Sequence, residues 1–354
     1  MTTTQTSDIA SLLDTVSPAL SLDEVDGIAR DVFGLTARVS ELTGERDRNF
    51  HLQVGDEHYV LKVSNPAESR EVIDFQTRAL LHIAQVDPGL PVPRLVPTRA
   101  GAAEWVLMRG HEAPRVVRVL SFLQGVPFHR VSATPMLRRN LGMATARLDL
   151  AMRGFFHPAA GHELMWDLKH ASRVRDLLVH IQDEARRALA QRYLDTFEVH
   201  ALPKLPNLRA QVIHNDLNPH NVLVSPDDHS RIAGIIDFGD MVHAPLINNL
   251  AVAAAYQLAP DGHPLETAAE MIAAYHGVLP LEPEELDILF DLIVTRMVLT
   301  VAITGWRAAR YPENATYILR NNPQAWAGLA RCNELSRTEA QAYLRKACQA
   351  ERPI

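Results

Sequence analysis

The sequence has little cysteine and no long run of charge of one sign. Its two cysteines, Cys332 and Cys348, lie close together, and the sequence leaves open whether they pair. Two cysteines do not make the disulfide framework of a small secreted protein. The formal net charge is -7, without a block of five or six like charges. Because nucleic-acid phosphates are bound by basic stripes, this balance argues against a nucleic-acid partner.

The sequence also lacks a segment with the features of a signal peptide or a membrane span. Residues 1–12 contain no basic start followed by an apolar stretch, which a signal peptide needs. The most apolar region, residues 289–306, is interrupted by Asp291, Arg296 and several polar side chains. We therefore interpret it as a buried helix, and we expect a cytoplasmic protein without a membrane partner.

What the sequence does contain is ordinary material for a soluble globular protein. It has 354 residues, of which 47% are hydrophobic and 22% are charged. At roughly 150 residues per domain, this length suggests two domains. A chain of this size buries enough apolar surface to fold without a disulfide or a structural metal.

The first part of the chain is rich in β-type segments and the remainder in helical ones. The first 123 residues predict helices at 21–33 and 67–83, and strands at 38–42, 49–54, 58–63, 105–108 and 115–122. Long helical patterns then cover residues 135–153, 174–196, 264–276, 282–308 and 336–350, around one strand–loop–strand unit at 211–240. We predict an α+β fold with a small β-rich lobe (1–123), a large helical lobe (124–354) and a ligand cleft between them.

The strand–loop–strand unit carries the residues that point to a chemistry. Residues 212–224 have the form H-x-D-x-x-x-x-N between apolar strands, with Asp216 and Asn221 in the loop, and Asp237 follows sixteen residues after Asn221. Phosphoryl transfer needs a carboxylate beside the attacking hydroxyl and oxygen ligands for Mg²⁺. We expect Asp216 to be the general base or orienting acceptor, and Asn221 and Asp237 to be the metal ligands.

These two motifs resemble the aminoglycoside phosphotransferase and choline kinase superfamily. Residues 216–221 (DLNPHN) and 234–241 (GIIDFGDM) are particularly similar to hydroxylysine kinases and to phosphotransferase domains associated with class III aminotransferases. The similarity extends to residues 164–168 and 307–326, so it covers nearly the whole chain. The resemblance implies a protein-kinase-like two-lobe fold with the nucleotide in the cleft. It also implies an ATP- and Mg²⁺-dependent phosphotransferase with an alcohol group as acceptor.

A lysine in the first lobe is the expected phosphate contact. Lys62 lies in a predicted strand, and a strand lysine in this context resembles the one that contacts the α- and β-phosphates; a solvent-facing edge lysine is the alternative. Kinases usually hold this lysine with a helix glutamate. Here Gln76 occupies the middle of the apolar stripe of helix 67–83, where Glu71 lies off its centre. We predict that Gln76 partners Lys62, with Glu71 as the alternative.

Two further segments of the first lobe are expected to contact the nucleotide. Residues 42–50 occupy the place of the phosphate-covering loop but contain only one glycine, Gly44, so this motif is weak. Asn49 is a possible donor to the phosphates. Residues 118–125 resemble the hinge between lobes, where main-chain groups near Phe122 would bind adenine.

The acceptor pocket is the least defined part of the prediction. Candidate residues in the helical lobe are Trp166, Asp167, Asp240, Trp306 and Arg307. A carboxylate and an aromatic face suit an ammonium group, and an arginine suits a carboxylate. The structural alternatives are equally open: the tryptophans as core residues, Asp167 as a helix N-cap and Asp240 as a brace for the metal loop.

The predicted acceptor is therefore a small molecule with an amine and a hydroxyl, such as a hydroxylysine-like amino acid or an amino alcohol. An aminoglycoside, homoserine or a choline-type alcohol is the alternative within kinases. Outside them, Gln76 keeps open a catalytically weak ATP-binding pseudokinase. A metal-dependent hydrolase using His214, Asp216 and His220 fits no zinc-ligand spacing.

Overall fold

The computed structural model describes residues 17–42, 44 and 46–350. The chain divides into two compact units. The first comprises Met1–Gln124 with the short segments His157–His162 and Gly234–Ile236, and the second comprises Gly125–Phe156, Glu163–Ala233 and Asp237–Ile354. The sequence predicts a single boundary after residue 123, whereas the first unit also takes two short segments from later in the chain. The binding roles assigned to the two parts stay predictions.

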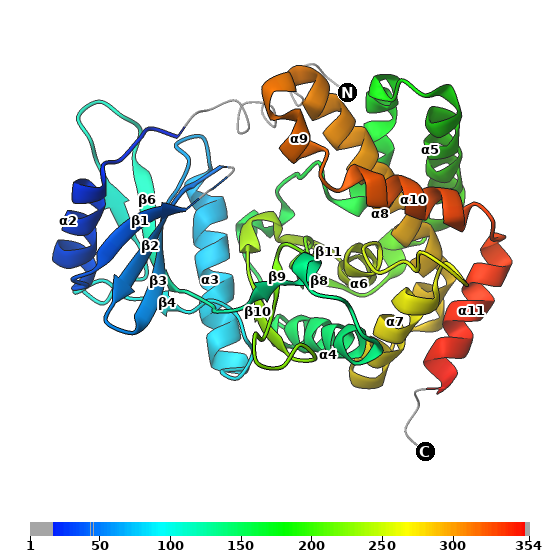
Figure 1. Cartoon of the computed structure of the whole chain (residues 1–354), viewed down its shortest axis with the longest axis horizontal. Helices are drawn as coiled ribbons and strands as arrows, with labels where there is room; N and C mark the ends of the chain where they lie inside the picture. The colour runs from blue at the N-terminus through cyan, green and yellow to red at the C-terminus, as the bar shows by residue number, and fades with distance from the viewer. Residues whose placement is uncertain (1–16, 43, 45, 351–354) are drawn as a thin grey trace. The chain divides into compact units, whose positions relative to one another are not determined.

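The first unit is built on one antiparallel sheet in the order β1-β2-β3-β6-β4, with β5 also paired to β6 (Figure 1). Its strands are β1 (Arg38–Leu42), β2 (Arg48–Val54), β3 (Glu57–Val63), β4 (Leu95–Val96), β5 (Trp105–Leu107) and β6 (Arg115–Ser121). Gly55 has a φ of 60° in the turn that joins β2 to β3, a conformation that costs glycine little. The hairpin predicted from this turn is confirmed.

Two helices cover opposite faces of this sheet. The helix α2 (Leu22–Phe33) begins at a capping box between Ser21 and Glu24 and packs on alternate strand residues such as Phe50, Leu61 and Val119. The helix α3 (Arg70–Val86) contacts the side chain of Arg118. Because neighbouring residues of a strand point to opposite faces, α2 and α3 lie on either side of the sheet, as Figure 1 shows.

Two small sheets flank the predicted catalytic loop. The strand β8 (Ala210–Ile213) pairs with β11 (Val242–Pro245), and β9 (Val222–Val224) lies between β10 (Ile232–Ile235) and β7 (Val126–Pro127). The loop between β8 and β9 and the loop between β10 and β11 therefore start and end on paired strands. This topology brings the two loops side by side.

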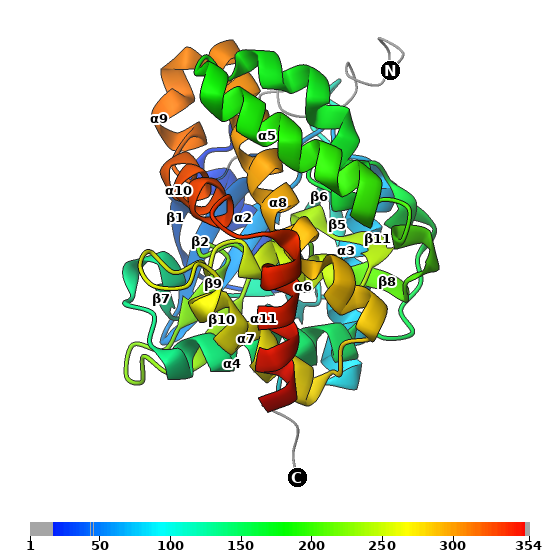
Figure 2. The same cartoon turned by 90° about the vertical axis from the view of Figure 1, so that its right-hand side faces the viewer.

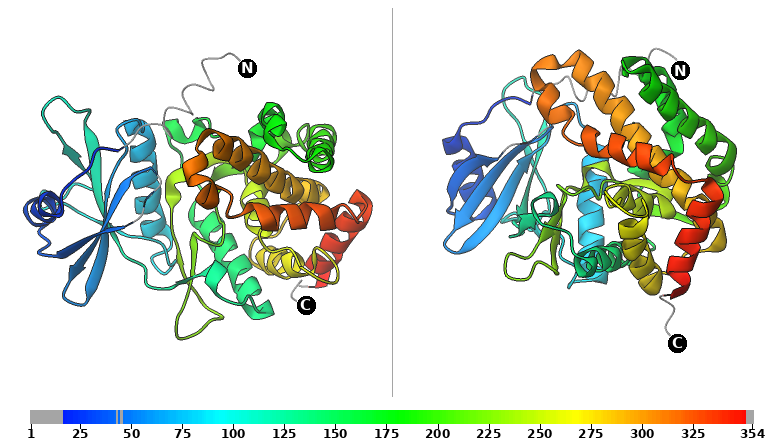
Figure 3. Two further views of the ribbon diagram at one scale, coloured as in Figure 1. Left: turned by 45° about the horizontal axis from the view of Figure 1, so that its top comes forward. Right: turned by 45° about the vertical axis from the view of Figure 1, so that its right-hand side comes forward.

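Helices make up most of the second unit. They are α4 (Pro135–Ala151), α5 (Glu184–Thr196), α6 (Ile247–Ala254), α7 (Glu266–Val278), α8 (Pro283–Arg310), α9 (Ala315–Ile318), α10 (Asn322–Cys332) and α11 (Arg337–Ala350). The 28-residue α8 is buried from Leu286 to Thr304, and α6, α10 and α11 pack against it (Figures 2 and 3). The α+β architecture predicted from the sequence is confirmed.

One predicted helix is wrong in its extent. Residues 174–196 were expected to form a single helix, but 3₁₀ turns (η3, Leu168–His180) come first and α5 starts only at Glu184. The reason is local: the side chain of Asp183 accepts a hydrogen bond from the N–H of Arg186 and so starts a new helix.

The structure also bears on two points of the sequence analysis, the pairing of the two cysteines and the presence of a membrane-spanning helix. Cys332 and Cys348 are both buried, and neither forms a disulfide bond. Within residues 17–42, 44 and 46–350, no helix is long and apolar enough to cross a membrane.

Candidate active site

Two residues at the adjoining loops have an unusual backbone conformation. Asn215 has a φ of 65° and Asp237 a φ of 62°, and among the described residues they are the non-glycine residues with positive φ. Asparagine and aspartate tolerate this left-handed region better than other residues, but it still costs free energy. Such strain persists only where surrounding contacts hold it, so the loops must be braced by the rest of the unit.

A buried polar network supplies that brace for Asn215. The main-chain N–H of Asn215 donates to Oδ1 of Asn249 (3.0 Å), and Nδ2 of Asn249 donates to Oδ1 of Asp149 (2.6 Å). The hydroxyl of Tyr275 donates to the other oxygen of Asp149 (2.7 Å). Burial raises the pKa of Asp149 to about 7, although both hydrogen bonds oppose the shift. No pattern in the sequence predicts this network, because its members come from three separate helices, α4, α6 and α7.

The carboxylate of Asp216 receives three side-chain donors. Its Oδ2 accepts from Nδ2 of Asn221 (2.7 Å) and Nδ2 of Asn218 (2.9 Å), and its Oδ1 accepts from Nη2 of Arg296 (3.0 Å). The pKa of Asp216 is raised to about 7 mainly by burial, which the positive charge of Arg296 opposes. The negative charges of Asp240 and Asp237 raise this pKa further. Asp216 is therefore a fixed, desolvated carboxylate.

Arg296 is a site residue that the sequence prediction missed. It lies in the middle of α8 with 2% of its side chain exposed. Its guanidinium group lies 4.9 Å from the ring centre of Trp166, and its Nη1 donates to the main-chain oxygen of Trp166 (3.2 Å). It also hydrogen-bonds to the side chain of Tyr256. An arginine inside the most apolar helix was the available signal, because a buried charge is rarely left without a partner.

Asn221 and Asp237 fit a magnesium ion. Nδ2 of Asn221 donates to both the main-chain oxygen (3.0 Å) and Oδ2 of Asp216, so its side-chain oxygen is the amide atom left for a ligand. The negative charges of Asp237 and Asp240 both act on Asp216, and negative charge at this place favours a bound cation. Magnesium takes a few protein oxygens and completes its shell with water and phosphate. The donor set therefore matches the ion.

The predicted acceptor residues are not all available to a ligand. Asp167 is fully buried; its Oδ1 caps η3 by accepting from the N–H of Lys169 (3.0 Å), and its Oδ2 lies 3.1 Å from Nζ of Lys169. This hydrogen bond is the one expected of a helix N-cap. Because the carboxylate of Asp167 is buried and paired with Lys169, it is not accessible to a substrate. Trp166 is partly exposed but carries Arg296 on its ring.

Among the remaining acceptor candidates, Asp240 acts on Asp216 through its charge. It is the last residue of the 3₁₀ turn Phe238–Asp240, and its charge acts on both Asp216 and Arg296. Trp306 and Arg307 are partly buried in α8, about 15 Å along the helix axis from Arg296. Their roles in acceptor binding stay predictions.

The phosphate side of the prediction needs a correction. Oε1 of Gln76 accepts from Nη2 of Arg118 (3.0 Å), whereas Nζ of Lys62 lies 3.4 Å from Oδ2 of Asp47. Gln76 therefore does not hold Lys62. Lys62 and Arg118 are opposite each other on β3 and β6, so both side chains face α3, and the guanidinium takes the amide oxygen.

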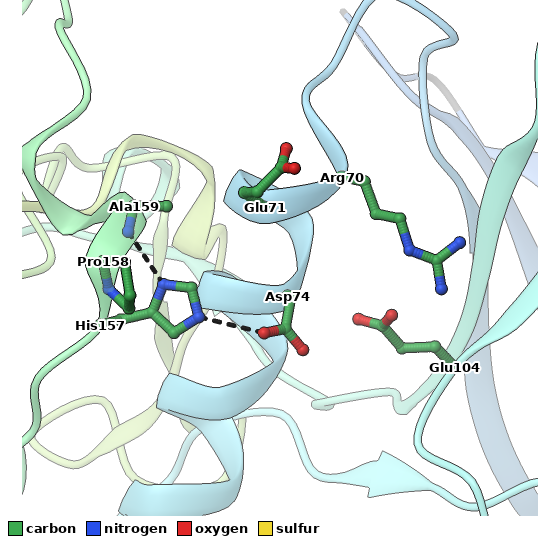
Figure 4. Close-up of a pocket in the computed structure, with 7 residues that line it drawn as sticks. All are labelled: Arg70, Glu71, Asp74, Glu104, His157, Pro158 and Ala159. Carbon is green, nitrogen blue, oxygen red and sulfur yellow. Dashed lines mark hydrogen bonds and ion pairs between the residues drawn. The ribbon is translucent and has the colours of Figure 1, made fainter.

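Glu71, the alternative partner of Lys62, is also engaged elsewhere. Its carboxylate accepts from the hydroxyl of Ser69 (2.5 Å). It borders a pocket of about 570 Å³ in which Nε2 of His157 lies 3.0 Å from Oδ2 of Asp74 (Figure 4). The pocket is lined by Arg70, Glu71, Asp74, Glu104, His157, Pro158 and Ala159. Neither helix residue proposed from the sequence contacts Lys62 in the described part of the chain.

The expected phosphate loop is tight at its single glycine. A Cβ at Gly44 would collide with the main-chain oxygen of Asp47 and with Nδ2 of Asn49, so this position requires glycine. Asn49 lies opposite Lys62 on β2, and its Oδ1 is buried without a hydrogen-bond partner. Thr43 and Glu45 of this loop lie outside the described residues.

Phe122 follows β6 in the predicted hinge. Its main-chain N–H donates to the oxygen of His58 (3.0 Å), and its ring lies 5.1 Å from that of His51. This N–H is thus already used in a hydrogen bond to His58, so main-chain groups near Phe122 other than this one would have to bind adenine. A contact between Phe122 and the nucleotide stays a prediction.

The hydrolase alternative finds no ligand set in the described residues. Across residues 17–42, 44 and 46–350, no group of three His, Cys, Asp or Glu side chains could hold a metal ion. His214 instead packs its ring edge against Phe238 at 4.7 Å, and His220 lies 4.1 Å from the ring of His129.

Known proteins share this fold and much of the sequence. The chain is 28% identical over 352 residues to the hydroxylysine kinase of Danio rerio, covering 95% of this chain and 98% of that protein. A solved microcompartment-associated aminopropanol kinase has a TM-score of 0.62 at 20% identity and covers 92% of this chain and 98% of its own. Amicoumacin kinase, solved with AMP-PNP, Ca²⁺ and Ami, has a TM-score of 0.57 at 14% identity and covers 91% and 93%.

A family model agrees with these similarities. The model of the phosphotransferase enzyme family matches residues 38–289, more than half of the chain, including both loops described above. This protein therefore belongs to the phosphotransferase enzyme family and is an ATP-dependent phosphotransferase that acts on a hydroxyl group.

Proposed function

We propose that the hydroxyl group belongs to a small amino alcohol or hydroxylated amino acid of the hydroxylysine type. The observation that carries this proposal is the site around Asp216, a half-buried carboxylate held by three donors with a second carboxylate, Asp240, within electrostatic reach. One carboxylate can receive the hydroxyl and the other an ammonium group on the same molecule. The named substrates of the hydroxylysine and aminopropanol kinases carry both groups.

The residues of the two loops divide the work. Asp216 accepts a hydrogen bond from the acceptor hydroxyl, orients its oxygen toward the γ-phosphorus and takes its proton as the new bond forms. Asn221 and Asp237 hold Mg²⁺, which neutralises phosphate charge when bound. Lys62 contributes a cation to the nucleotide phosphates, and its ammonium group has donors left beside its ion pair with Asp47.

Recognition of the amine is assigned to Asp240. Its charge is felt at Asp216, so an ammonium group bound to it stays close to the reacting hydroxyl. Asp167 is not part of this assignment, because Lys169 already neutralises it. An aminoglycoside or a homoserine-type alcohol is the competing acceptor, and neither places a single ammonium group close to the reacting hydroxyl in this simple way.

We further propose that the protein acts in the cytoplasm. Its two cysteines form no disulfide bond, as is usual where thiols are kept reduced. Its net charge of -7 gives no general attraction to nucleic acids. Its partner in this proposal is the small-molecule acceptor alone.

The test is a panel of acceptors assayed by ADP formation with MgATP. The panel contains hydroxylysine, 1-amino-2-propanol, ethanolamine, homoserine, choline, an aminoglycoside and 2-propanol. We expect kcat/KM for the best amino alcohol to exceed that for 2-propanol by about 100-fold or more, because 2-propanol lacks the ammonium group that the Asp240 carboxylate would bind. Asp240→Asn is expected to remove most of this preference. Equal rates with and without the amine, or fastest turnover of the aminoglycoside, would contradict the proposed acceptor.

A further inference from the structure

We propose that Arg296 is a positioning residue for phosphoryl transfer, which fixes Asp216 so that Oδ1 faces the acceptor hydroxyl. The proposal rests on the proposed role of Asp216 as the residue that receives this hydroxyl. It assigns to Arg296 a role in catalysis that goes beyond pairing with a buried charge.

The two oxygens of Asp216 are not equally occupied. Oδ2 accepts two hydrogen bonds, from Asn218 (2.9 Å) and Asn221 (2.7 Å), while Oδ1 accepts one, from Arg296 (3.0 Å). A carboxylate oxygen offers about two lone-pair positions. Oδ2 is therefore saturated by the loop itself, and Oδ1 has one position left. The acceptor hydroxyl is expected on Oδ1, next to the guanidinium of Arg296.

Arg296 holds this oxygen from a rigid base. Its side chain is 2% exposed and comes from the buried middle of α8. It spans two partners with different nitrogens: Nη2 reaches Asp216, and Nη1 reaches the main-chain oxygen of Trp166 at 3.2 Å. The ring of Trp166 lies against the same guanidinium at 4.9 Å. Arg296 thus links the catalytic carboxylate to the segment before η3.

This bridging geometry requires arginine. A guanidinium is planar and presents several donors in a fixed fork, so it can bind a carboxylate and a carbonyl at the same time. A lysine ammonium keeps the positive charge but lacks the fork and the flat face that stacks on an indole ring. Arg296→Lys therefore separates the effect of orientation from the effect of charge.

The competing interpretation is that the pair only stabilises the fold. Removing one partner of a buried ion pair generally destabilises a protein, so loss of activity alone would not decide. The same helix offers a matched control: Nη2 of Arg337 lies 2.8 Å from Oδ2 of Asp291, a residue of α8 with 1% of its side chain exposed. The side-chain hydrogen bonds of Arg337 go to Asp291 and to the main-chain oxygen of Asp287, both in α8, so Arg337→Lys measures the structural cost of such a change.

The experiment compares Arg296→Lys with Arg337→Lys. For each variant, kcat and KM are measured for the best acceptor of the panel. The affinity for MgATP is measured by titration calorimetry, and the melting temperature is measured by scanning calorimetry. We expect Arg296→Lys to lower kcat by about 100-fold, as a misplaced reacting group does, with MgATP affinity within about twofold of wild type. Arg337→Lys is expected to keep kcat. Exogenous guanidinium should restore part of the kcat of Arg296→Ala.

A structure of Arg296→Lys with a non-hydrolysable ATP analogue judges the proposal independently of the acceptor. We expect the Asp216 carboxylate to turn and the main chain at Trp166 to shift. Unchanged Asp216 and Trp166 positions, or a kcat that falls only as much as in Arg337→Lys, would overturn the role of Arg296. Failure of wild-type protein to phosphorylate the amino alcohols would instead contradict the proposed acceptor, and the structural comparison would still decide on Arg296.

Discussion

Asp216 in the second unit and Lys62 in the first are both charged groups assigned to phosphoryl transfer, but their surroundings differ. Asp216 receives three side-chain donors at 2.7–3.0 Å, and the loop that carries it is braced by a buried network. Lys62 has about a quarter of its side chain exposed and one ion pair, at 3.4 Å with Asp47. One charge is held in place before any ligand arrives, and the other is held loosely.

The difference follows from what each group must do. The rate of phosphoryl transfer falls when the side chain that orients the attacking hydroxyl is slightly displaced. Such a side chain therefore benefits from being held in place before the substrate binds. A residue that receives a flexible triphosphate can adjust after binding. Among the described residues, Gln76 stands where the usual helix glutamate would be and accepts a hydrogen bond from Arg118, so it does not hold Lys62. Lys62 can therefore adjust to the nucleotide, but its side chain is not held in one position before the nucleotide binds.

The largest effect is expected from the metal ligands of the rigid site. Asp237→Asn should lower kcat on the order of 1,000-fold, since a bound ion contributes several kcal/mol of charge stabilisation. The rate should recover partly at high Mg²⁺ concentration. The measurement is kcat as a function of Mg²⁺. A normal rate at ordinary Mg²⁺ would show that Asp237 is not a metal ligand.

A smaller effect is expected at the adjustable site. Lys62→Ala should lower kcat/KM for ATP by about 10- to 100-fold, the value of one charge-assisted hydrogen bond. Lys204→Ala is the control, because it removes a surface lysine that pairs with Asp287 at 3.1 Å. Steady-state kinetics with varied ATP checks both variants. Equal effects of the two substitutions would contradict the phosphate role of Lys62.

The Arg118–Gln76 contact is expected to matter for stability more than for rate. Arg118→Met leaves the buried amide oxygen of Gln76 without its donor, which costs about 1–3 kcal/mol. Urea unfolding measures this loss. A KM for ATP that rises as far as in Lys62→Ala would show instead that Arg118 binds the nucleotide directly.

The brace below the rigid site should make stability depend on pH. Because burial raises the pKa of Asp149 to about 7 from an ordinary value of 3.8, the folded state binds a proton that the unfolded state releases between these values. The free energy of unfolding therefore falls as pH rises through this window, on the order of 1–3 kcal/mol. Urea unfolding at pH 5 and pH 8 measures the fall, which should be smaller in Asp149→Asn. The same pH dependence in both proteins would contradict the assignment.

The sequence predicts the local parts of this molecule better than its long-range contacts. Asp216, Asn221 and Asp237 lie in short motifs whose spacing reflects one chemical demand, and the Gly55 hairpin has a turn signal of its own. The partners of Gln76 and Asp216 are Arg118 and Arg296, which lie 42 and 80 residues away. Only tertiary packing selects such pairs. A charged residue in the apolar stretch 289–306 indicates that it has a partner, but the sequence does not show which residue this partner is.

The break before α5 teaches the same lesson at the level of helices. The helical periodicity of the sequence predicts one helix over residues 174–196. It does not show that Asp183 is the N-cap of a separate helix, α5. Conversely, Asp167 was predicted both as an acceptor residue and as a cap. Its burial and its pairing with Lys169 favour the cap, and burial is the property that sequence reasoning could not supply.

The most direct test of the central claim is Asp216→Asn, because it removes the charge from the fixed carboxylate and keeps its shape. We measure single-turnover transfer from ATP to the best amino alcohol together with the affinity for MgATP. The account predicts that transfer slows by about 1,000-fold, within the range of general-base catalysis, while MgATP binds within about twofold of wild type. Transfer at a rate close to wild type, or loss of MgATP binding with transfer retained, would contradict it.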